Sequence, residues 1–455
     1  MRVHLIAPSR EENPGTHSRT SIAPPLNLAV LASISPPEVE ISLTDENVEP
    51  IDCGQAADLV GITATTQTAT RAYQVADAFR ARGVKVALGG LHPSTLPEEA
   101  VQHADAVVVG EAEGVWPHLL SDLRDGRLQR IYRGNGRPQL AGLPIPRRDL
   151  FHRKRYLLSD SLYTSRGCPF GCAFCSVTSF FGGTYRWRPV DEVLREISEL
   201  DGRPLIFFVD DNIAGHKEYA RELFLALAAR KVGWIGQAST TIARDQGLLA
   251  LAAASGCRGL FLGIESLSPA SLGSVGKRQN VVEEYEEAIR RIHAHNIAIV
   301  GSFIFGLDDD TEDVFDLTVR FAQRTRLEAA EFNILMPYPG TPLMARLERE
   351  GRILTRDWSQ YREDRAVFAP RLMSVRRLEE GRAWAWREFY SLGSIWKRVG
   401  LSAPMGLMVW TMNLEHRSDP LSRAVFDRLA SWASPFFQDM LEKRPADDQR
   451  PSRNS

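Results

Sequence analysis

The first part of the chain alternates short apolar runs with segments of helical periodicity. The apolar runs are 3–7, 39–44, 59–63, 84–89 and 106–109, and the helical segments are 26–33, 68–81 and 96–102. Short apolar runs are typical of strands buried on both faces, and helices between them indicate a parallel sheet covered on both sides. We therefore predict a Rossmann-like α/β domain over residues 1–133, with its ligand beyond the carboxyl ends of the strands.

A second alternating series follows a segment rich in proline, glycine and arginine, 134–155, which predicts a linker. The strands predicted in this series are 162–165, 205–209, 234–238, 259–264, 299–305 and 332–336, with helices at 190–200, 217–229, 246–254, 281–295 and 311–324. Six strand–helix units favour a partial (β/α)6 barrel over a complete eight-fold one, and we assign it to residues 156–357. The chemistry of such barrels lies at the carboxyl ends of the strands.

From about Trp358 the pattern becomes polar and helical, which predicts a helical C-terminal cap over 358–440 and a disordered tail over 441–455. The cap region is rich in aromatic residues: Trp384, Trp386, Phe389, Tyr390, Trp396 and Trp410. Two interpretations stay open for them. They pack as a cover on the barrel, or they line a pocket for a hydrophobic or aromatic substrate.

Composition narrows the function classes. Hydrophobic residues make up 44% and charged residues 25% of the chain, as in ordinary globular proteins. The net charge of −2 gives no sign of a nucleic-acid partner, which a strong basic excess would. No stretch approaches the ~20 apolar residues of a transmembrane segment, and the start of the chain does not resemble a signal peptide. We therefore expect a cytoplasmic protein.

Three of the five cysteines, Cys168, Cys172 and Cys175, lie within eight residues directly after a predicted strand. An odd, clustered set argues against a disulfide framework and for metal binding in a reducing compartment. A structural zinc site would need a fourth ligand from a second Cys or His pair, and Cys53, Cys257 and the histidines lack the spacing. Three thiolates can instead hold three irons of a cubane cluster and leave the fourth iron open to a ligand.

Further polar or small residues end the other predicted barrel strands. Asp210, Asp211 and Asn212 follow one strand, Gln237 ends the next, Glu265 leaves an apolar run, and Gly306 ends a later strand. Each has a plainer alternative: a helix N-cap for the Asp210 cluster, a cap or salt bridge for Glu265, and a simple turn with Asp308–Asp310 capping the next helix for Gly306. Phe174 offers an aromatic face just before the third cysteine.

Three strand ends of the N-terminal sheet carry small or polar residues: Thr63, Thr65, Thr66 and Gln67; Gly89, Gly90 and His92; Gly110 and Glu111. Such residues predict a flat, open platform at the carboxyl ends of these strands. A dinucleotide would need a G-x-G-x-x-G fingerprint, which the sequence lacks. The plainer interpretation of His92 is a loop histidine hydrogen-bonded to backbone, and that of the whole sheet is a domain without a cofactor.

The run Cys168-Pro-Phe-Gly-Cys172-Ala-Phe-Cys175 resembles the signature of radical S-adenosylmethionine (SAM) enzymes. With the sheet in front, roughly residues 1–370 resemble the cobalamin-binding radical SAM enzymes, and methyltransferases in particular. The resemblance implies a 4Fe-4S cluster on the three cysteines, SAM chelated by the open iron, and cobalamin on the N-terminal sheet. It places SAM near Phe174, Asp210, Asp211, Asn212, Gln237, Glu265 and Gly306, and cobalamin near Thr63, Thr65, Thr66, Gln67, Gly89, Gly90, His92, Gly110 and Glu111. Because the sequence lacks Asp-x-His-x-x-Gly, the resemblance implies no histidine lower ligand and a nucleotide tail tucked into the sheet.

The implied activity is methylation of an unactivated carbon of a small molecule. Cobalamin would carry a methyl group from one SAM, and a second SAM would give a 5′-deoxyadenosyl radical that activates the substrate, with electrons from an external flavodoxin- or ferredoxin-like donor. Alternatives are a cobalamin-dependent cyclase or oxidase without methyl transfer, a methylthiotransferase, and a non-catalytic cluster protein. A methylthiotransferase would need three more N-terminal cysteines, and only Cys53 is present. The substrate class stays open, with hydrophobic, polycyclic and tetrapyrrole molecules as candidates.

Overall fold

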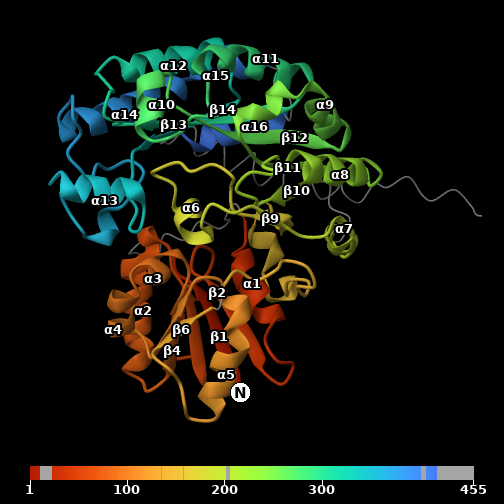
Figure 1. Cartoon of the computed structure of the whole chain (residues 1–455), viewed down its shortest axis with the longest axis vertical. Coiled ribbons are helices and arrows are strands. Elements are labelled where there is room, and N and C mark those ends of the chain that lie inside the picture. The colour runs from red at the N-terminus through yellow and green to blue at the C-terminus, as the bar shows by residue number, and fades with distance from the viewer. Residues whose placement is uncertain (11–22, 135, 157, 201–204, 401–405, 418–455) are drawn as a thin grey trace, which may run out of the picture.

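The computed structural model describes residues 1–10, 23–134, 136–156, 158–200, 205–400 and 406–417, and contains two parallel six-stranded sheets (Figure 1). The first sheet has the strand order β2-β1-β3-β4-β5-β6. Its strands are β1 (Arg2–Ala7), β2 (Glu40–Asp45), β3 (Leu59–Thr63), β4 (Lys85–Gly89), β5 (Ala106–Val109) and β6 (Ile131–Arg133). Its helices are α1 (Leu26–Ser33), α2 (Ala69–Arg80), α3 (Leu91–Thr95), α4 (Pro97–His103) and α5 (Trp116–Arg124).

The predicted Rossmann-like sheet is confirmed, with two differences. Strand β6 and helix α5 were not predicted, because β6 has only three residues and α5 a weak apolar pattern. The helix predicted over 96–102 is the second of two, α3 and α4, separated at Leu96. Pro97 disfavours helical backbone in the residue before it, so the helix restarts at the proline.

The second sheet has the order β14-β13-β12-β11-β10-β7 and confirms a partial six-stranded barrel. Its strands are β7 (Ser161–Leu162), β10 (Leu205–Phe208), β11 (Gly233–Ala238), β12 (Cys257–Glu265), β13 (Ala298–Phe305) and β14 (Ala329–Ile334). Helices α7 (Val190–Ser198), α8 (Lys217–Ala228), α9 (Gln246–Ala254), α11 (Tyr285–Ala294) and α12 (Val314–Arg324) follow the strands in turn. Shorter helices are α6 (Ser176–Phe181), α10 (Pro269–Ser274) and α13 (Pro342–Arg349).

The first barrel strand differs from the prediction of 162–165. The chain leaves the barrel sheet after Leu162, and β8 (Ser165–Arg166) pairs instead with β9 (Arg186–Trp187) in an antiparallel hairpin. Residues 167–185, which contain the three cysteines and α6, therefore form the segment enclosed by this hairpin.

The two faces of the barrel sheet differ in burial. Phe303 pairs in register with Phe332, and both are fully buried on the face that the helices cover. Ser302 pairs with Gly263 on one side and Glu331 on the other, on the opposite, concave face. Side chains on the concave face stay half-exposed, including those of Phe207, Ile235, Gln237, Phe261 and Glu331.

Side chains from outside the barrel sheet satisfy backbone groups at its two open edges. At β7, Arg148 Nη2 donates to Ser161 O at 2.7 Å, and Arg188 Nη1 donates to Tyr163 O at 3.2 Å. At β14, Arg382 Nε donates to Phe332 O at 2.8 Å, and the Tyr390 hydroxyl donates to Ala330 O at 2.8 Å. An open barrel exposes two strand edges that could pair with other chains, and these contacts cover them.

The segment after the barrel divides between the two sheets. Trp358, Tyr361 and Val367 pack in the core of the first sheet, and Trp358 Nε1 donates to Glu99 Oε1 at 2.9 Å. A cap on the barrel alone, as predicted from residue 358, is therefore wrong for this stretch. The boundaries at 133, 155 and 357 stay predictions.

Helices α14 (Val375–Phe389), α15 (Leu392–Val399) and α16 (Gly406–Glu415) lie against the barrel. Phe389 and Tyr390 are buried in its core and Trp386 packs against that core, which favours the covering role for these residues. Trp384 and Trp396 are 37% and 59% exposed. The tail predicted over 441–455, and the cap beyond residue 417, lie outside the described residues.

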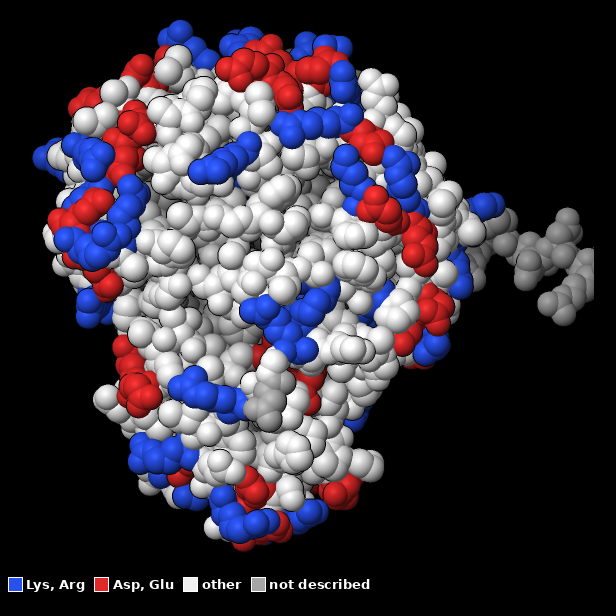
Figure 2. All heavy atoms as spheres, viewed as in Figure 1, with Lys and Arg blue, Asp and Glu red and all other residues white. Residues whose placement is uncertain are grey.

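The surface carries charges of both signs. On the face shown in Figure 2, basic and acidic side chains are interspersed, and a broad central area holds few of them. Among the described helices, none has the length and apolar character required to cross a bilayer.

Candidate functional site

The cysteine loop runs from β8 to α6 and is held by two distant parts of the chain. The Ala173 N–H donates to Val275 O at 2.8 Å, and the Leu343 N–H donates to Ala173 O at 2.9 Å. These contacts come from the residue after α10 and from the first turn of α13. The loop conformation is therefore fixed from both sides before any ligand binds.

The three thiols are free of disulfides, and Cys172 is buried while Cys168 and Cys175 are half-buried. Burial raises the pKa of the Cys168 and Cys175 thiols, so a bound metal would be needed to keep them ionised. In the described part of the chain, no three Cys, His, Asp or Glu side chains gather as ligands of one ion do. In a cubane cluster each of the three thiolates would bind a different iron.

Amide side chains contact two of the sulfur atoms. Asn212 Nδ2 lies 4.0 Å from Cys168 Sγ, and Gln279 Nε2 lies 3.6 Å from Cys172 Sγ. Hydrogen bonds to ligand sulfurs tune iron–sulfur clusters. Gln279 was not predicted, because it lies in a turn far along the chain and no local pattern marks it.

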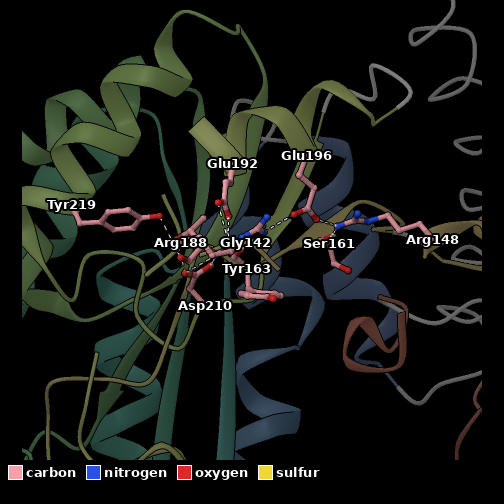
Figure 3. A network of polar contacts seen from close by, with 10 residues as sticks. Gly142, Arg148, Ser161, Tyr163, Arg188, Glu192, Glu196, Asp210 and Tyr219 are labelled. Atoms are coloured by element: carbon pink, nitrogen blue, oxygen red, sulfur yellow. Dashed lines mark hydrogen bonds and ion pairs between the residues drawn. The ribbon is translucent and has the colours of Figure 1, made fainter. Parts of the chain in front are cut away.

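Asp210 lies where it holds the base of the cysteine loop. It is fully buried, and its carboxylate accepts the Thr164 N–H at 3.0 Å and the Thr164 hydroxyl at 2.7 Å, and also a bond from the Ser165 hydroxyl. Burial raises its pKa. Figure 3 shows Asp210 among the polar contacts around the end of β7, and its predicted SAM contact stays a prediction.

Asp211 and Asn212 make different contacts from those of Asp210. Asp211 Oδ2 accepts the Gly167 N–H at 3.0 Å, and burial raises the pKa of Asp211 to about 6. Asn212 Oδ1 accepts the Ser239 N–H at 3.4 Å, so this amide joins the β11 end to the first cysteine. Gln237 lies on the concave face of β11. These three residues remain candidates for SAM binding.

Glu265 forms the salt bridge that the sequence left open as an alternative. Its Oε1 lies 2.6 Å from Lys277 Nζ, and both side chains are largely buried. Burial alone lowers the pKa of Lys277, but the Glu265 carboxylate and the neighbouring thiols raise it overall. Lys277 Nζ also lies 5.9 Å from the centre of the Phe174 ring. The pair therefore stands beside the cysteine loop, with Phe174 packed over it.

Gly306 follows the plainer alternative. Its φ is +92°, and a Cβ there would lie 2.8 Å from Leu378 Cδ2, so core packing explains the glycine. Asp310 Oδ2 accepts the N–H groups of Gly306 and Leu307, both at 3.0 Å. Gly306 therefore lies in a capped turn against α14, and its predicted SAM contact stays a prediction.

A cavity of about 1500 Å³, its open mouth included, lies between the carboxyl ends of the first sheet and the cysteine loop. The first sheet and its helices supply Thr63, Thr65, Gly89, Gly90, Gly110 and Glu111 among other lining residues. The barrel side supplies Tyr163, Arg166, Phe180, Phe181 and Asp211. Small residues make its floor, and the cavity reaches between α1 and α5 as far as Ile34 and Trp116. A broad macrocycle with an appended tail fits this shape.

Six of the nine predicted platform residues line the cavity, and Thr66, Gln67 and His92 are not among its lining residues. His92 is buried, with Nδ1 3.2 Å from Thr66 Oγ1 and Nε2 3.1 Å from Glu99 Oε1. Gln67 Nε2 donates to Tyr338 OH at 3.0 Å. Gln67 and His92 thus contact Tyr338 and Trp358 of the post-barrel segment, and the cobalamin assignment of these three residues stays a prediction.

The lining residues of α1 and α6 were not predicted. Leu26 and Val30 lie on α1, which was predicted only as a helix beside the sheet, and Phe180 and Phe181 lie on α6, which was not predicted. An apolar helical residue carries no local sign that it faces a ligand and not a core.

The sequence profile of the radical SAM superfamily matches residues 162–322, and that of the B12 binding domain matches residues 15–120. Together with the fold and the cysteine loop, these matches define a radical SAM enzyme with an N-terminal B12-binding domain. Its cofactors are a 4Fe-4S cluster, SAM and cobalamin, and the thiols and the cavity described above fit the cluster and cobalamin.

Relatives narrow the family further. The chain is 33% identical to bacteriochlorophyllide d C-12(1)-methyltransferase of Chlorobaculum tepidum over 86% of this chain and 88% of that protein. It is 28% identical to hopanoid C-2 methylase of Rhodopseudomonas palustris over 73% of this chain and 66% of that protein. The chain belongs to the B12-binding radical SAM family that contains these methyltransferases.

Solved structures share the fold. The radical SAM methyltransferase TsrM of Kitasatospora setae, with cobalamin and a [4Fe-4S] cluster bound, has a TM-score of 0.66, 16% identity and coverage of 97% of this chain and 100% of that chain. The cobalamin-dependent enzyme OxsB has a TM-score of 0.68, 15% identity and coverage of 97% and 71%.

Proposed function

We propose that this enzyme transfers a methyl group to an unactivated carbon of a polycyclic, largely apolar small molecule. The observation that carries the proposal is the shared cavity. Tyr163, Arg166 and Asp211 line it while standing at the root of the cysteine loop, so a ligand on the first sheet and one at the cluster lie against the same residues.

The cofactors supply a transferable methyl group and, by reductive cleavage of SAM, a hydrogen-abstracting radical. The protein's residues bind, orient and exclude water. Asn212 and Gln279 contact the ligand sulfurs, and Glu265 with Lys277 places one buried ion pair beside them. Phe180, Phe181 and Tyr163 form an apolar wall that keeps water from the space between the two sites.

The cavity supplies no obvious lower ligand for cobalt. Among the described residues that line it, none is a histidine, cysteine or methionine. The residues that would hold cobalamin are those of the floor and of α1, among them Thr63, Gly89 and Val30. Asn27 and Thr63 both line the cavity, and Asn27 Nδ2 donates to Thr63 Oγ1 at 2.9 Å.

The substrate class is supported by the concave face of the barrel. Phe207, Ile235 and Phe261 give it an apolar lining, and Gln237 and Glu331 add two polar points. Two relatives are named for the methylation of bacteriochlorophyllide d and of hopanoids. A molecule of that kind would bury apolar area on this face and be oriented by the polar points.

The test uses the anaerobically reconstituted full chain with cobalamin, SAM carrying an isotope-labelled methyl group, and a panel of tetrapyrroles and hopanoids. We expect the label in one product, at a carbon, with 5′-deoxyadenosine and S-adenosylhomocysteine as by-products. A protein that binds both cofactors and forms a new ring without label would be a cyclase. A protein that binds no cobalamin would contradict the proposal.

The electron donor and the location of the enzyme are also proposals. A small flavodoxin- or ferredoxin-like protein would reduce the cluster, and the clustered cysteines, which are typical of metal sites in reducing compartments, favour the cytoplasm. Reduction of the cluster by candidate donors, followed by electron paramagnetic resonance (EPR), would test the first point.

A further inference from the structure

Two arginines of the β8–β9 hairpin form salt bridges with two glutamates of the B12-binding domain. Arg166 Nη1 lies 2.7 Å from Glu111 Oε2, and Arg166 Nη2 lies 2.5 Å from Glu113 Oε1. Arg186 Nη2 lies 2.6 Å from the other oxygen of Glu111. All four side chains are less than one-fifth exposed. We call this set the glutamate–arginine clamp.

The clamp is rigid for reasons visible on both sides. Arg166 and Arg186 face each other in register across the antiparallel hairpin, so they present one fork to Glu111. The Arg166 guanidinium lies 4.7 Å from the centre of the Tyr163 ring, and Arg186 Nη1 donates to Pro138 O at 2.6 Å. A carboxylate held by two guanidinium groups is fixed in direction as well as distance.

The clamp lies between the segment that carries the cysteines and the floor of the cavity. The hairpin is the base of the segment 167–185, which carries the three cysteines, and Glu111 and Glu113 follow β5 at the floor of the cavity. The clamp therefore joins the base of the cluster-bearing loop directly to the floor on which cobalamin would lie.

We propose that Glu111 and its two arginines are positioning residues that set the distance between cobalamin and the cluster, and so permit methyl transfer between SAM and cobalamin. The inference rests on the proposed methyl transfer. It assigns Glu111 to the barrel arginines and not to the cofactor, although Glu111 lines the cavity.

The test compares the full-length, reconstituted enzyme with its Glu111→Gln variant. Iron content and reductive cleavage of SAM to 5′-deoxyadenosine report on the cluster alone, and we expect both within about twofold of wild type. Hydroxocobalamin affinity reports on the cavity that Glu111 lines, and we expect it to be retained because Gln has the size of Glu and both Glu111 oxygens already bond to the arginines. Formation of S-adenosylhomocysteine from SAM and titanium(III)-reduced cobalamin, without substrate, needs both sites in register. We expect this rate to fall at least about tenfold, because a displacement near 1 Å can cost far more.

A spectroscopic readout is independent of turnover. Pulsed EPR measures the distance between cob(II)alamin and the reduced cluster, and we expect a broader distribution in Glu111→Gln than in wild type. Arg186→Lys keeps the charge but loses the planar fork, so it should give an intermediate result and serves if Glu111→Gln fails to fold. Glu99→Gln is the matched control: it loosens the contact with Trp358, on another side of the same domain, and should leave the distribution unchanged.

Four results would overturn the inference: an unchanged distribution in Glu111→Gln, an unchanged methyl-transfer rate, loss of cobalamin from that variant, or equal broadening in Glu99→Gln. Loss of cobalamin would make Glu111 a cofactor contact, and equal broadening would mean general loosening between the sheets. If wild-type protein binds both cofactors but transfers no methyl group, the proposed function fails, and the distance distributions still decide the role of the clamp.

Discussion

The two sheets of this enzyme present their carboxyl ends to each other, but with opposite chemistry. The first sheet ends in small, neutral residues such as Thr63, Gly89, Gly90 and Gly110. The barrel ends in thiols, carboxylates, amides and a buried lysine–glutamate pair. Parallel strands place a ligand beyond their carboxyl ends in both cases, so side-chain size and charge decide which ligand each sheet takes.

The charges of the first platform confirm this division. Glu111 and Glu113 are its acidic residues at the cavity, and arginines from the barrel neutralise both. The cavity floor on which cobalamin would lie is therefore made of small side chains and is nearly neutral. The barrel end, by contrast, has charged side chains beside the expected sites of the cluster and SAM. Four changes test how independent the two platforms are.

The largest effect is expected from Cys168→Ala. Loss of one of three thiolates should remove the cluster and with it all reductive cleavage of SAM. Hydroxocobalamin should still bind, because the cavity floor lies on the other sheet. Iron analysis and a cobalamin titration on the same sample measure both sides. Cobalamin that no longer binds would show that the two platforms assemble only together.

Gly90→Val should damage the cobalamin platform alone. Gly90 has a φ of +100°, and a Cβ there would lie 2.6 Å from Ala64 O. We expect a loss of about 2–4 kcal/mol in the free energy of unfolding, and at least tenfold weaker cobalamin binding, because strain and the side chain both fall at the cavity. Gly126→Val, at φ +69° with open space around its Cβ, is the control. An equal loss of cobalamin affinity in both variants would show that the effect of Gly90→Val does not come from its place at the cavity.

Glu331, on the concave face of the barrel, should make stability depend on pH. Burial raises its pKa from 4.5 to about 7. Between these values the folded protein holds a proton that the unfolded chain has released, so the free energy of unfolding falls as pH rises through this window. Glu331→Gln should remove about 1–3 kcal/mol of this fall, measured by urea unfolding at pH 5 and pH 8. The exposed Glu380→Gln is the control, and an identical pH slope in both variants would contradict the assignment.

The smallest effect concerns the seam between the sheets. Trp358→Phe keeps an aromatic ring in the first core but loses the donor to Glu99, so we expect about 1 kcal/mol of destabilisation. Thermal unfolding with and without cobalamin measures it. If Trp358→Phe instead lost the cluster and kept its stability, the post-barrel segment would be supporting the barrel and not the first sheet.

Much of the fold was predictable because alternation of apolar runs and helices depends on local sequence. The runs at 59–63 and 299–305 became β3 and β13 almost residue for residue. The prediction failed at the first barrel strand, which pairs with β10 over only two residues. Apolar periodicity through residues 162–165 could not show that the chain leaves the barrel after Leu162, since the partner of Ser165 is Trp187, beyond the cysteine loop.

The sequence by itself determined the clustered spacing of the three cysteines, the two parallel sheets and the small residues at the first platform, because spacing, periodicity and side-chain size are local properties. Only the tertiary structure decided that Asp210 holds the loop, that Glu265 pairs with Lys277, and that His92 faces Trp358 and not the cavity. It also brought Glu111 to Arg166, 55 residues away, at the base of the cysteine loop. A side chain's partner depends on which residues folding brings to it, and no local pattern records that.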